Sequence, residues 1–177
     1  MVNNILIFVA GLACGAVGIL SIPHIREQFK PSYIYDYPFS IDIPPVHLNP
    51  ASHQSSPVSY YAVDFPMPLG TPVLAARSGV VLSVRDDSDE YGTDIKYVNK
   101  VNQILILHED NIMTEYNHLE RNSAQVKLGD IVRVGDVLAV TGNSGYTFGP
   151  HLHFNVVKTY KNGKQYSLPV KFKSRDS

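Results

Sequence analysis

The stretch Pro150-His151-Leu152-His153-Phe154 decides the fold, because two histidines alternate in it with two large apolar side chains. Successive side chains of an extended strand point to opposite faces. His151 and His153 therefore share one face at a spacing of roughly 6.6 Å, while Leu152 and Phe154 turn toward a core. The pattern predicts a strand with one buried face and one face that can bind a cation.

The sequence around this stretch has the composition of β-strands. Short runs rich in β-branched residues are separated by Gly, Asn, Asp and Pro. These runs cover residues 73–84, 103–108, 112–118, 131–140 and 151–157. No segment with a helical period of comparable strength follows residue 30. We therefore expect an all-β domain over residues 58–177.

The composition excludes several classes of protein. The chain has 177 residues, 44% of them hydrophobic, which suffices for one ordinary domain with a core. Its formal net charge of -1 offers no basic surface of the kind that binds nucleic acid, so no nucleic-acid partner is expected. The single cysteine, Cys14, lies in an apolar run outside the domain. A metal ion would therefore have to be held by His, Asp or Glu.

Residues 1–30 are predicted to be a membrane anchor with its juxtamembrane segment. The run 5–22 contains no charged side chain and is long enough for a short transmembrane helix. Two alternatives stay open. The sequence Leu-Ala-Cys that ends at Cys14 is similar to a lipoprotein cleavage box, and a secretory signal can also be cleaved from this region.

Residues 31–57 are predicted to form an extended, partly ordered connector. Prolines interrupt this segment repeatedly, and no period is sustained along it. Tyr33, Tyr35 and Tyr37 alternate in the connector. We expect these amphipathic rings to pack against the domain.

A Gly-Asp-apolar unit occurs twice, at Gly129-Asp130 and Gly135-Asp136. Glycine and aspartate both suit tight turns, the first through its conformational freedom and the second through side-chain hydrogen bonds to the backbone. Asp130 and Asp136 are therefore interpreted as turn residues and not as metal ligands.

Several further segments, taken together and in order, resemble the lysostaphin-type zinc metallopeptidase family. The similarity runs from about residue 59 to residue 157. The segments are Tyr61-Ala62-Val63-Asp64-Phe65, Pro68-Leu69-Gly70-Thr71-Pro72-Val73, Ala75-Ala76-Arg77-Ser78-Gly79-Val80-Val81, Tyr116-Asn117-His118-Leu119, Gly129-Asp130 and Gly149-Pro150-His151-Leu152-His153-Phe154.

The resemblance implies a compact antiparallel β-sheet domain with a groove, which hydrolyses peptide bonds in bacterial peptidoglycan. It implies Zn²⁺ as the cofactor, with Asp64 and His153 as ligands. His118 and His151 would line the site as catalytic residues that assist the attacking water. The expected location is the cell membrane, crossed once, with the domain in the periplasm or outside the cell and peptidoglycan peptides as its partners.

The chain departs from the family pattern at Tyr60, which stands four residues before Asp64, where the family usually has its first ligand histidine. The resemblance is therefore to a variant that lacks the usual first ligand. If residues 60–64 form a strand, Tyr60 and Asp64 share a face. We favour His53 as the replacement ligand, folded back by the loop 55–59, over His47, whose segment is held extended by prolines.

The tyrosine at position 60 also leaves two alternative interpretations open, a weaker zinc site and a domain without metal. Zinc can be held weakly by Asp64 and His153, alone or with Tyr60, although a phenol is an uncommon ligand. Alternatively, the domain binds no metal and serves as a cell-wall-binding scaffold or as an activator of a separate partner hydrolase. The sequence favours a zinc endopeptidase, because Asp64, His118, His151 and His153 are all present.

For two histidines the sequence favours particular environments. His108 ends an apolar run and is expected to have a strand-end role. If residues 112–118 form one strand, His118 shares a face with Thr114 and Tyr116.

Overall fold

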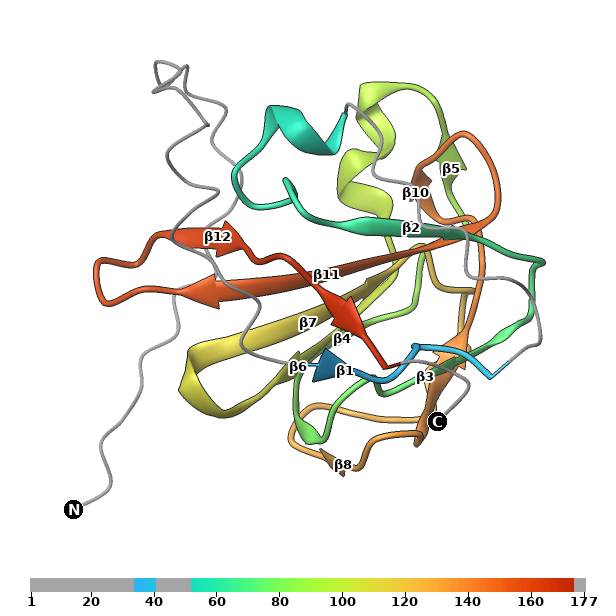
Figure 1. Cartoon of the computed structure of the whole chain (residues 1–177). Helices are drawn as coiled ribbons and strands as arrows, with labels where there is room; N and C mark the ends of the chain where they lie inside the picture. The colour runs from blue at the N-terminus through green and yellow to red at the C-terminus, as the bar shows by residue number, and fades with distance from the viewer. Residues whose placement is uncertain (1–33, 41–51, 174–177) are drawn as a thin grey trace.

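A computed structural model describes residues 34–40 and 52–173 of the chain (Figure 1). Its centre is a seven-stranded antiparallel sheet in the order β12-β11-β7-β6-β4-β8, in which β2 also pairs with β11. The strands of this sheet are β2 (Val63–Pro66), β4 (Gly79–Arg85), β6 (Gln103–Leu107), β7 (Ile112–Asn117), β8 (Ile131–Val132), β11 (His151–Thr159) and β12 (Gln165–Ser167).

Three two-stranded pairs and three short 3-10 helices complete the described structure. The pairs are β1 (Ile34–Tyr35) with β13 (Lys171–Phe172), β3 (Pro72–Leu74) with β9 (Val137–Val140), and β5 (Tyr91–Gly92) with β10 (Gly145–Tyr146). The helices are His53–Ser55, Ile95–Lys100 and Glu109–Asn111. The prediction of a largely β structure with an antiparallel sheet is confirmed.

Strand β11 organises the sheet, because it has neighbours on both sides (Figure 1). Along one edge it pairs with β7. Along the other edge its first half pairs with β2, which places His153 opposite Asp64, and its second half pairs with β12. The sheet thus brings together segments that are far apart in the sequence.

The alternation expected along β11 is observed. Leu152 and Phe154 are fully buried, whereas His151 and His153 are partly exposed on the opposite face. Phe154 packs edge-to-face on Tyr116 of β7 with ring centroids 5.3 Å apart. One face of β11 therefore belongs to the core, and the other carries the imidazoles.

Part of the predicted connector belongs to the core. Strand β1 pairs in parallel with β13, and Tyr35 and Phe39 are buried. Tyr37 stacks on Phe172 with centroids 4.8 Å apart and an interplanar angle of 15°. The expected packing is thus confirmed for Tyr35 and Tyr37, while Tyr33 lies outside the described residues.

The predicted membrane anchor, residues 1–30, also lies outside the described residues. Between residues 34 and 40 and between 52 and 173, the structure has no helix that is long and apolar enough to cross a bilayer. The division of the chain at residues 30 and 57 stays a prediction.

The two Gly-Asp units form turns, as predicted. Asp130 accepts a hydrogen bond from the backbone N–H of Lys127 at 2.9 Å, and Asp136 accepts one from that of Arg133 at 2.7 Å. The preceding glycine has a positive φ in both cases, 89° and 87°. Their carboxylates are used in local turns.

Candidate metal centre

Three side chains from distant segments converge at the polar face of β11. His53 comes from the 3-10 helix at residues 53–55, Asp64 from β2 and His153 from β11. One donor atom from each lies within 4.8 Å of the donor atoms of the other two. Two imidazoles and a carboxylate at this separation form a set that can hold one metal ion.

Asp64 is the centre of this cluster, because each of its oxygens faces an imidazole. Oδ1 lies 2.9 Å from Nδ1 of His153, and Oδ2 lies 3.4 Å from Nε2 of His53. Nε2 of His151 lies 3.7 Å from Oδ1. Asp64 and His153, the two ligands that the resemblance implied, are thus adjacent in space. His53 lies beside them, as expected.

The usual ligand position is Tyr60, but the structure does not show a site that lacks its first ligand, because His53 supplies an imidazole. Strand β2 begins only at Val63, so Tyr60 lies in a turn before the strand. The shared face expected for Tyr60 and Asp64 is therefore absent. The Tyr60 ring instead packs edge-on against Tyr61, with centroids 4.8 Å apart.

His53 is held in an orientation suited to a ligand. Its Nδ1 donates to the carbonyl of Ala62 at 3.2 Å, which leaves Nε2 unprotonated and facing Asp64. A backbone carbonyl on the second ring nitrogen is the usual way in which proteins fix the tautomer and the orientation of a metal-binding histidine. His53 thus already has the tautomer that coordination requires.

His118 and His151 lie beside the three candidate ligands. Their ring centroids are 4.4 Å apart, and His118 is 6.0 Å from the ring of His153. Nδ1 of His118 donates to the carbonyl of Ser144 at 2.7 Å, and Nδ1 of His151 donates to that of Gly149 at 2.8 Å. In the neutral tautomer that these bonds select, each ring carries its proton on Nδ1 and has its lone pair on Nε2. The structure brings all five predicted site residues together.

His118 reaches the site through an unusual backbone conformation. Strand β7 ends at Asn117, and His118 has φ of 64°, in the left-handed region that non-glycine residues rarely adopt. The side chain thereby leaves the core face that Thr114 and Tyr116 occupy, so the predicted shared face is wrong. Strain of this kind costs on the order of 1 kcal/mol and is typical of functional positions.

Burial and neighbouring charges set the ionisation of the cluster. Burial, with smaller contributions from the nearby imidazoles, lowers the pKa of His118 to about 3. Burial also lowers the pKa of His53, against the opposing effect of Asp64. Burial alone would raise the pKa of Asp64, but the hydrogen bond from His153 and the nearby imidazoles outweigh it, so that pKa is lowered. Near neutral pH Asp64 is therefore an ionised carboxylate, while His53 and His118 are neutral.

The donors fit zinc. Imidazole nitrogen and carboxylate oxygen are common zinc ligands, and catalytic zinc sites typically use three protein ligands with a further position for water or substrate. The side chains of His53, Asp64 and His153 keep 11%, 14% and 11% of their surface exposed, so solvent reaches all three. His53, Asp64 and His153 would hold the ion.

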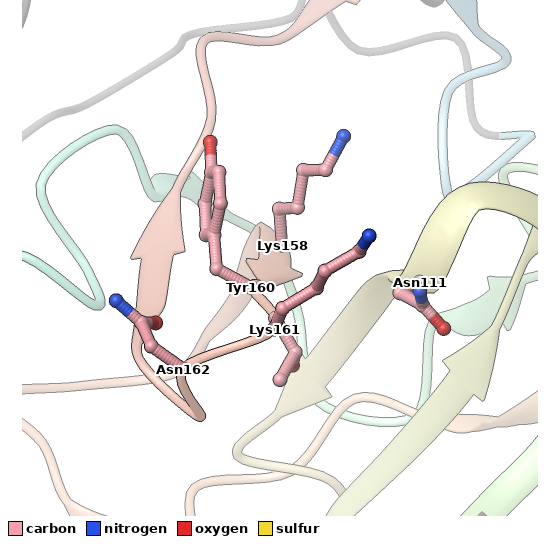
Figure 2. Close-up of a pocket in the computed structure, with 6 residues that line it drawn as sticks. Asn111, Lys158, Tyr160, Lys161 and Asn162 are labelled. Carbon is pink, nitrogen blue, oxygen red and sulfur yellow. The ribbon is translucent and has the colours of Figure 1, made fainter.

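Neither His108 nor a pocket elsewhere on the domain offers an alternative metal site. His108 is buried and bonds to the carbonyl of Ser78 and to the hydroxyl of Thr114, as suits a structural residue. Figure 2 shows a separate pocket beside the β11–β12 turn. Its lining contains no His, Asp or Glu and consists of Asn111, Lys158, Thr159, Tyr160, Lys161 and Asn162.

The hydrogen bonds that orient the imidazoles of His53, His118 and His151 could not be predicted from the sequence. The acceptors are the backbone carbonyls of Ala62, Ser144 and Gly149. Every residue type carries such a carbonyl, so no sequence signal marks them.

Comparison with known proteins agrees with this geometry. The sequence model of peptidase family M23 matches residues 59–167. The chain belongs to peptidase family M23. Within the family, this M23 chain is 34% identical over 139 residues to an uncharacterized metalloprotease of Buchnera aphidicola subsp. Baizongia pistaciae, an alignment that covers 78% of this chain and 32% of the relative.

A second M23 relative is the peptidoglycan DD-endopeptidase ShyA of Vibrio cholerae. It is 33% identical over 118 residues, which are 67% of this chain and 24% of ShyA. Among solved structures, the M23 metalloprotease pseudoalterin from the deep sea superposes with a TM-score of 0.55 at 24% identity, covering 77% of this chain and 75% of that protein. This last likeness shows the fold alone.

The chain spans about a third or less of the length of these two curated relatives. The residues that the family model matches, 59–167, contain Asp64, His118, His151 and His153. Together with His53, the chain has the complete His-Asp-His donor set of an M23 metalloendopeptidase domain, and zinc is its cofactor.

Proposed function

We propose that this chain is a membrane-attached zinc endopeptidase that hydrolyses peptide bonds in bacterial peptidoglycan. One observation carries the proposal: the cluster of His53, Asp64 and His153 lies directly beside the imidazoles of His118 and His151. A three-ligand metal site leaves a position for an activated water, and the two adjacent imidazoles can exchange protons with it.

Zinc bound at such a site lowers the pKa of a bound water toward about 7 and polarises the scissile carbonyl. The residues of the chain supply the remaining chemistry. In their neutral tautomers, His118 and His151 can each accept a proton at Nε2, because Nδ1 of each ring donates to a backbone carbonyl. A protonated imidazole can then donate to the developing oxyanion or to the leaving amine.

The substrate class is supported by the relatives. ShyA is named a peptidoglycan DD-endopeptidase, and it aligns with 67% of this chain. The imidazoles of His151 and His153 are partly exposed, so a peptide can reach them from solvent. We therefore propose the peptide cross-links as the target.

Membrane attachment is supported by the sequence of residues 1–30. The run 5–22 has no charged residue, and an uncharged segment of this length is long enough to cross the hydrocarbon core of a bilayer. We propose a single-pass anchor that holds the domain in the periplasm or outside the cell. Fractionation of cells that produce the tagged full chain, with alkaline carbonate washing of membranes, tests this. Release of the intact chain by carbonate would contradict the proposed membrane anchor.

The alternative of a metal-free scaffold or activator rested on Tyr60. Because His53 occupies the cluster in the described structure, that reason no longer applies. A partner hydrolase is then not needed for activity, and the full chain should act on the cell wall by itself.

The decisive experiment uses the full chain purified in mild detergent and loaded with one equivalent of zinc. Incubation with purified sacculi, followed by chromatography and mass spectrometry of muropeptides, should show cross-linked species decreasing and uncross-linked species increasing. The Asp64→Ala variant, which lacks the central carboxylate, is the matched control. Unchanged cross-linking with a protein that carries stoichiometric zinc would refute the proposed function.

A further inference from the structure

The loop that carries His53 is attached to the sheet at a specific point. Strand β2 pairs with residues 151–154 of β11, and β12 pairs with residues 157–159 along the same edge. Asn155 and Val156 lie between these two short partners. The segment that leads from His53 into β2 passes beside β12 at this point (Figure 1).

Asn155 makes three hydrogen bonds at this position, although it is 1% exposed. Its Nδ2 donates to the carbonyl of Val58 at 2.8 Å and to Oε2 of Glu115 at 2.9 Å. Its Oδ1 accepts from the hydroxyl of Ser167 at 2.8 Å. Both donor positions of the amide are thus used, and one of them holds the His53 loop.

Ser167 of β12 holds the same loop through two further contacts. Its Oγ accepts from the backbone N–H of Tyr61 at 3.0 Å, and its own N–H donates to the carbonyl of Pro57 at 2.8 Å. Ser167 is 2% exposed. Asn155 and Ser167 therefore fix three backbone groups of the loop, at Pro57, Val58 and Tyr61, in an environment where unpaired polar groups are costly.

The loop transmits this constraint to the ligand. The carbonyl of His53 accepts from the N–H of Ser56 at 3.2 Å and from the hydroxyl of Ser59 at 3.2 Å. Its ring donates to the carbonyl of Ala62, next to Tyr61. The backbone and the ring of His53 are therefore both bonded to the segment that Asn155 and Ser167 hold.

We propose that Asn155 and Ser167 are positioning residues for the metal ligand His53. A ligand on strand β2 would be fixed by the sheet, but His53 lies outside β2 and needs a separate attachment. The pair supplies it by joining the loop to β11, the strand that carries His153. This inference concerns the metal centre on which the proposed function rests, and it is tested by metal binding without any substrate.

The test compares zinc dissociation constants of the full chain, measured by competition with a chromophoric chelator. Ser167→Ala removes the hydroxyl, and we expect zinc affinity to fall by about 10- to 100-fold, as is typical when a group that orients a ligand is lost. Ser167→Thr keeps the hydroxyl and should restore the affinity. The electronic absorption spectrum of the cobalt-substituted protein should change in Ser167→Ala and return in Ser167→Thr.

Thr114→Val is the matched control. It removes a different buried hydroxyl, which bonds to Nε2 of His108 at 3.0 Å on the core side of the sheet. Its zinc affinity and cobalt spectrum should equal those of the wild type, even where its free energy of unfolding falls as far as that of Ser167→Ala. An equal loss of zinc affinity in both variants would reduce Ser167 to a general stabilising residue and overturn the inference.

A second measurement needs no variant. In the metal-free wild-type chain, the amides of Tyr61 and Ser167 should exchange with solvent as slowly as those within β11, because the loop is held before metal binds. Fast exchange at both amides, or an unchanged zinc affinity in Ser167→Ala, would overturn the proposal. Neither result depends on whether the chain hydrolyses peptidoglycan, so failure here is distinct from failure of the proposed function.

Discussion

Nε2 of His53 lies 3.4 Å from Oδ2 of Asp64, although a 3-10 helix and a series of turns separate the two residues along the chain. The metal centre is therefore completed by a loop that folds back over the start of β2. A ligand delivered in this way can change its position in the sequence while the donor geometry is kept, and this accounts for the tyrosine at position 60.

Replacing His53 with alanine should weaken zinc binding by at least about 100-fold, since one of three protein ligands is lost from a site in which each contributes several kcal/mol. The folded structure should persist, because His53 lies in a short 3-10 helix outside the sheet. Zinc affinity by chelator competition and circular dichroism of the metal-free protein measure the two effects. Tyr60→Phe is the control and should bind zinc normally; the opposite ranking of the two variants would assign the ligand to Tyr60.

Replacing His118 with asparagine should lower kcat by roughly 10²- to 10⁴-fold, the usual contribution of a general acid or base. Asparagine is chosen because it tolerates the positive φ observed at this position. Bound zinc should remain stoichiometric, which is checked by elemental analysis beside muropeptide release. A variant that keeps the wild-type kcat would exclude His118 from proton transfer.

His118 and His151 should act as a unit, since their rings are 4.4 Å apart and both face the same cluster. The double variant His118→Asn/His151→Ala is therefore expected to lose little more activity than the more damaged single variant, as is typical of residues that serve one step. Rates of all four proteins on sacculi form a double-mutant cycle. Losses that multiply would indicate two independent roles.

His108 should make the stability of the domain depend on pH. Burial lowers its pKa to about 4 in the folded chain, from about 6.5 when unfolded. Below pH 6.5 the unfolded chain binds a proton that the folded chain does not, so the free energy of unfolding should fall as the pH decreases from 6.5 to 4. The expected loss between pH 7 and pH 5 is about 2 kcal/mol from this residue.

Urea unfolding of the metal-free chain at both pH values measures this loss. His108→Gln removes the titrating group and should show a correspondingly smaller loss, which separates His108 from the buried imidazoles of the metal centre. Equal pH dependence in the wild type and the variant would mean that His108 ionises normally.

Asp136→Ala should lower the free energy of unfolding by about 1 kcal/mol through loss of the hydrogen bond from the N–H of Arg133. Zinc affinity should not change, because this carboxylate is used in a turn. Thermal unfolding and chelator competition test the two parts. Asp130→Ala, which affects the equivalent bond from Lys127, should behave alike; weaker zinc binding in either variant would contradict the turn assignment.

The parts of the fold that follow local periodicity could be predicted from the sequence. The alternation of histidines with Leu152 and Phe154 identified β11 and its two faces, and the Gly-Asp units identified the turns at residues 130 and 136. These features depend only on neighbours within a few residues, so the local sequence pattern is enough to predict them. Four candidate site residues, namely Asp64, His118, His151 and His153, came from resemblance to a family, and His53 was chosen as the replacement for the ligand missing at position 60. The structure places all five together.

The parts that could not be predicted depend on contacts between distant segments or on single backbone angles. Alternation along residues 112–118 placed His118 on the core face, but its positive φ reverses that direction. Likewise, the strand expected at residues 60–64 begins only at Val63. The importance of Asn155 was also not evident, since its partners, the carbonyl of Val58 and the side chains of Glu115 and Ser167, lie far from it in the sequence.

The parallel pairing of β1 with β13 has a practical consequence for anyone who isolates this enzyme. Tyr35 packs edge-on against Phe154 at 6.2 Å, directly behind the histidine-bearing face of β11. A fragment that starts at residue 59, where the family match begins, would lose Tyr35 and Phe39 and also His53. Recombinant versions should therefore start upstream of Ile34, or the catalytic strand will lack both its hydrophobic backing and a ligand.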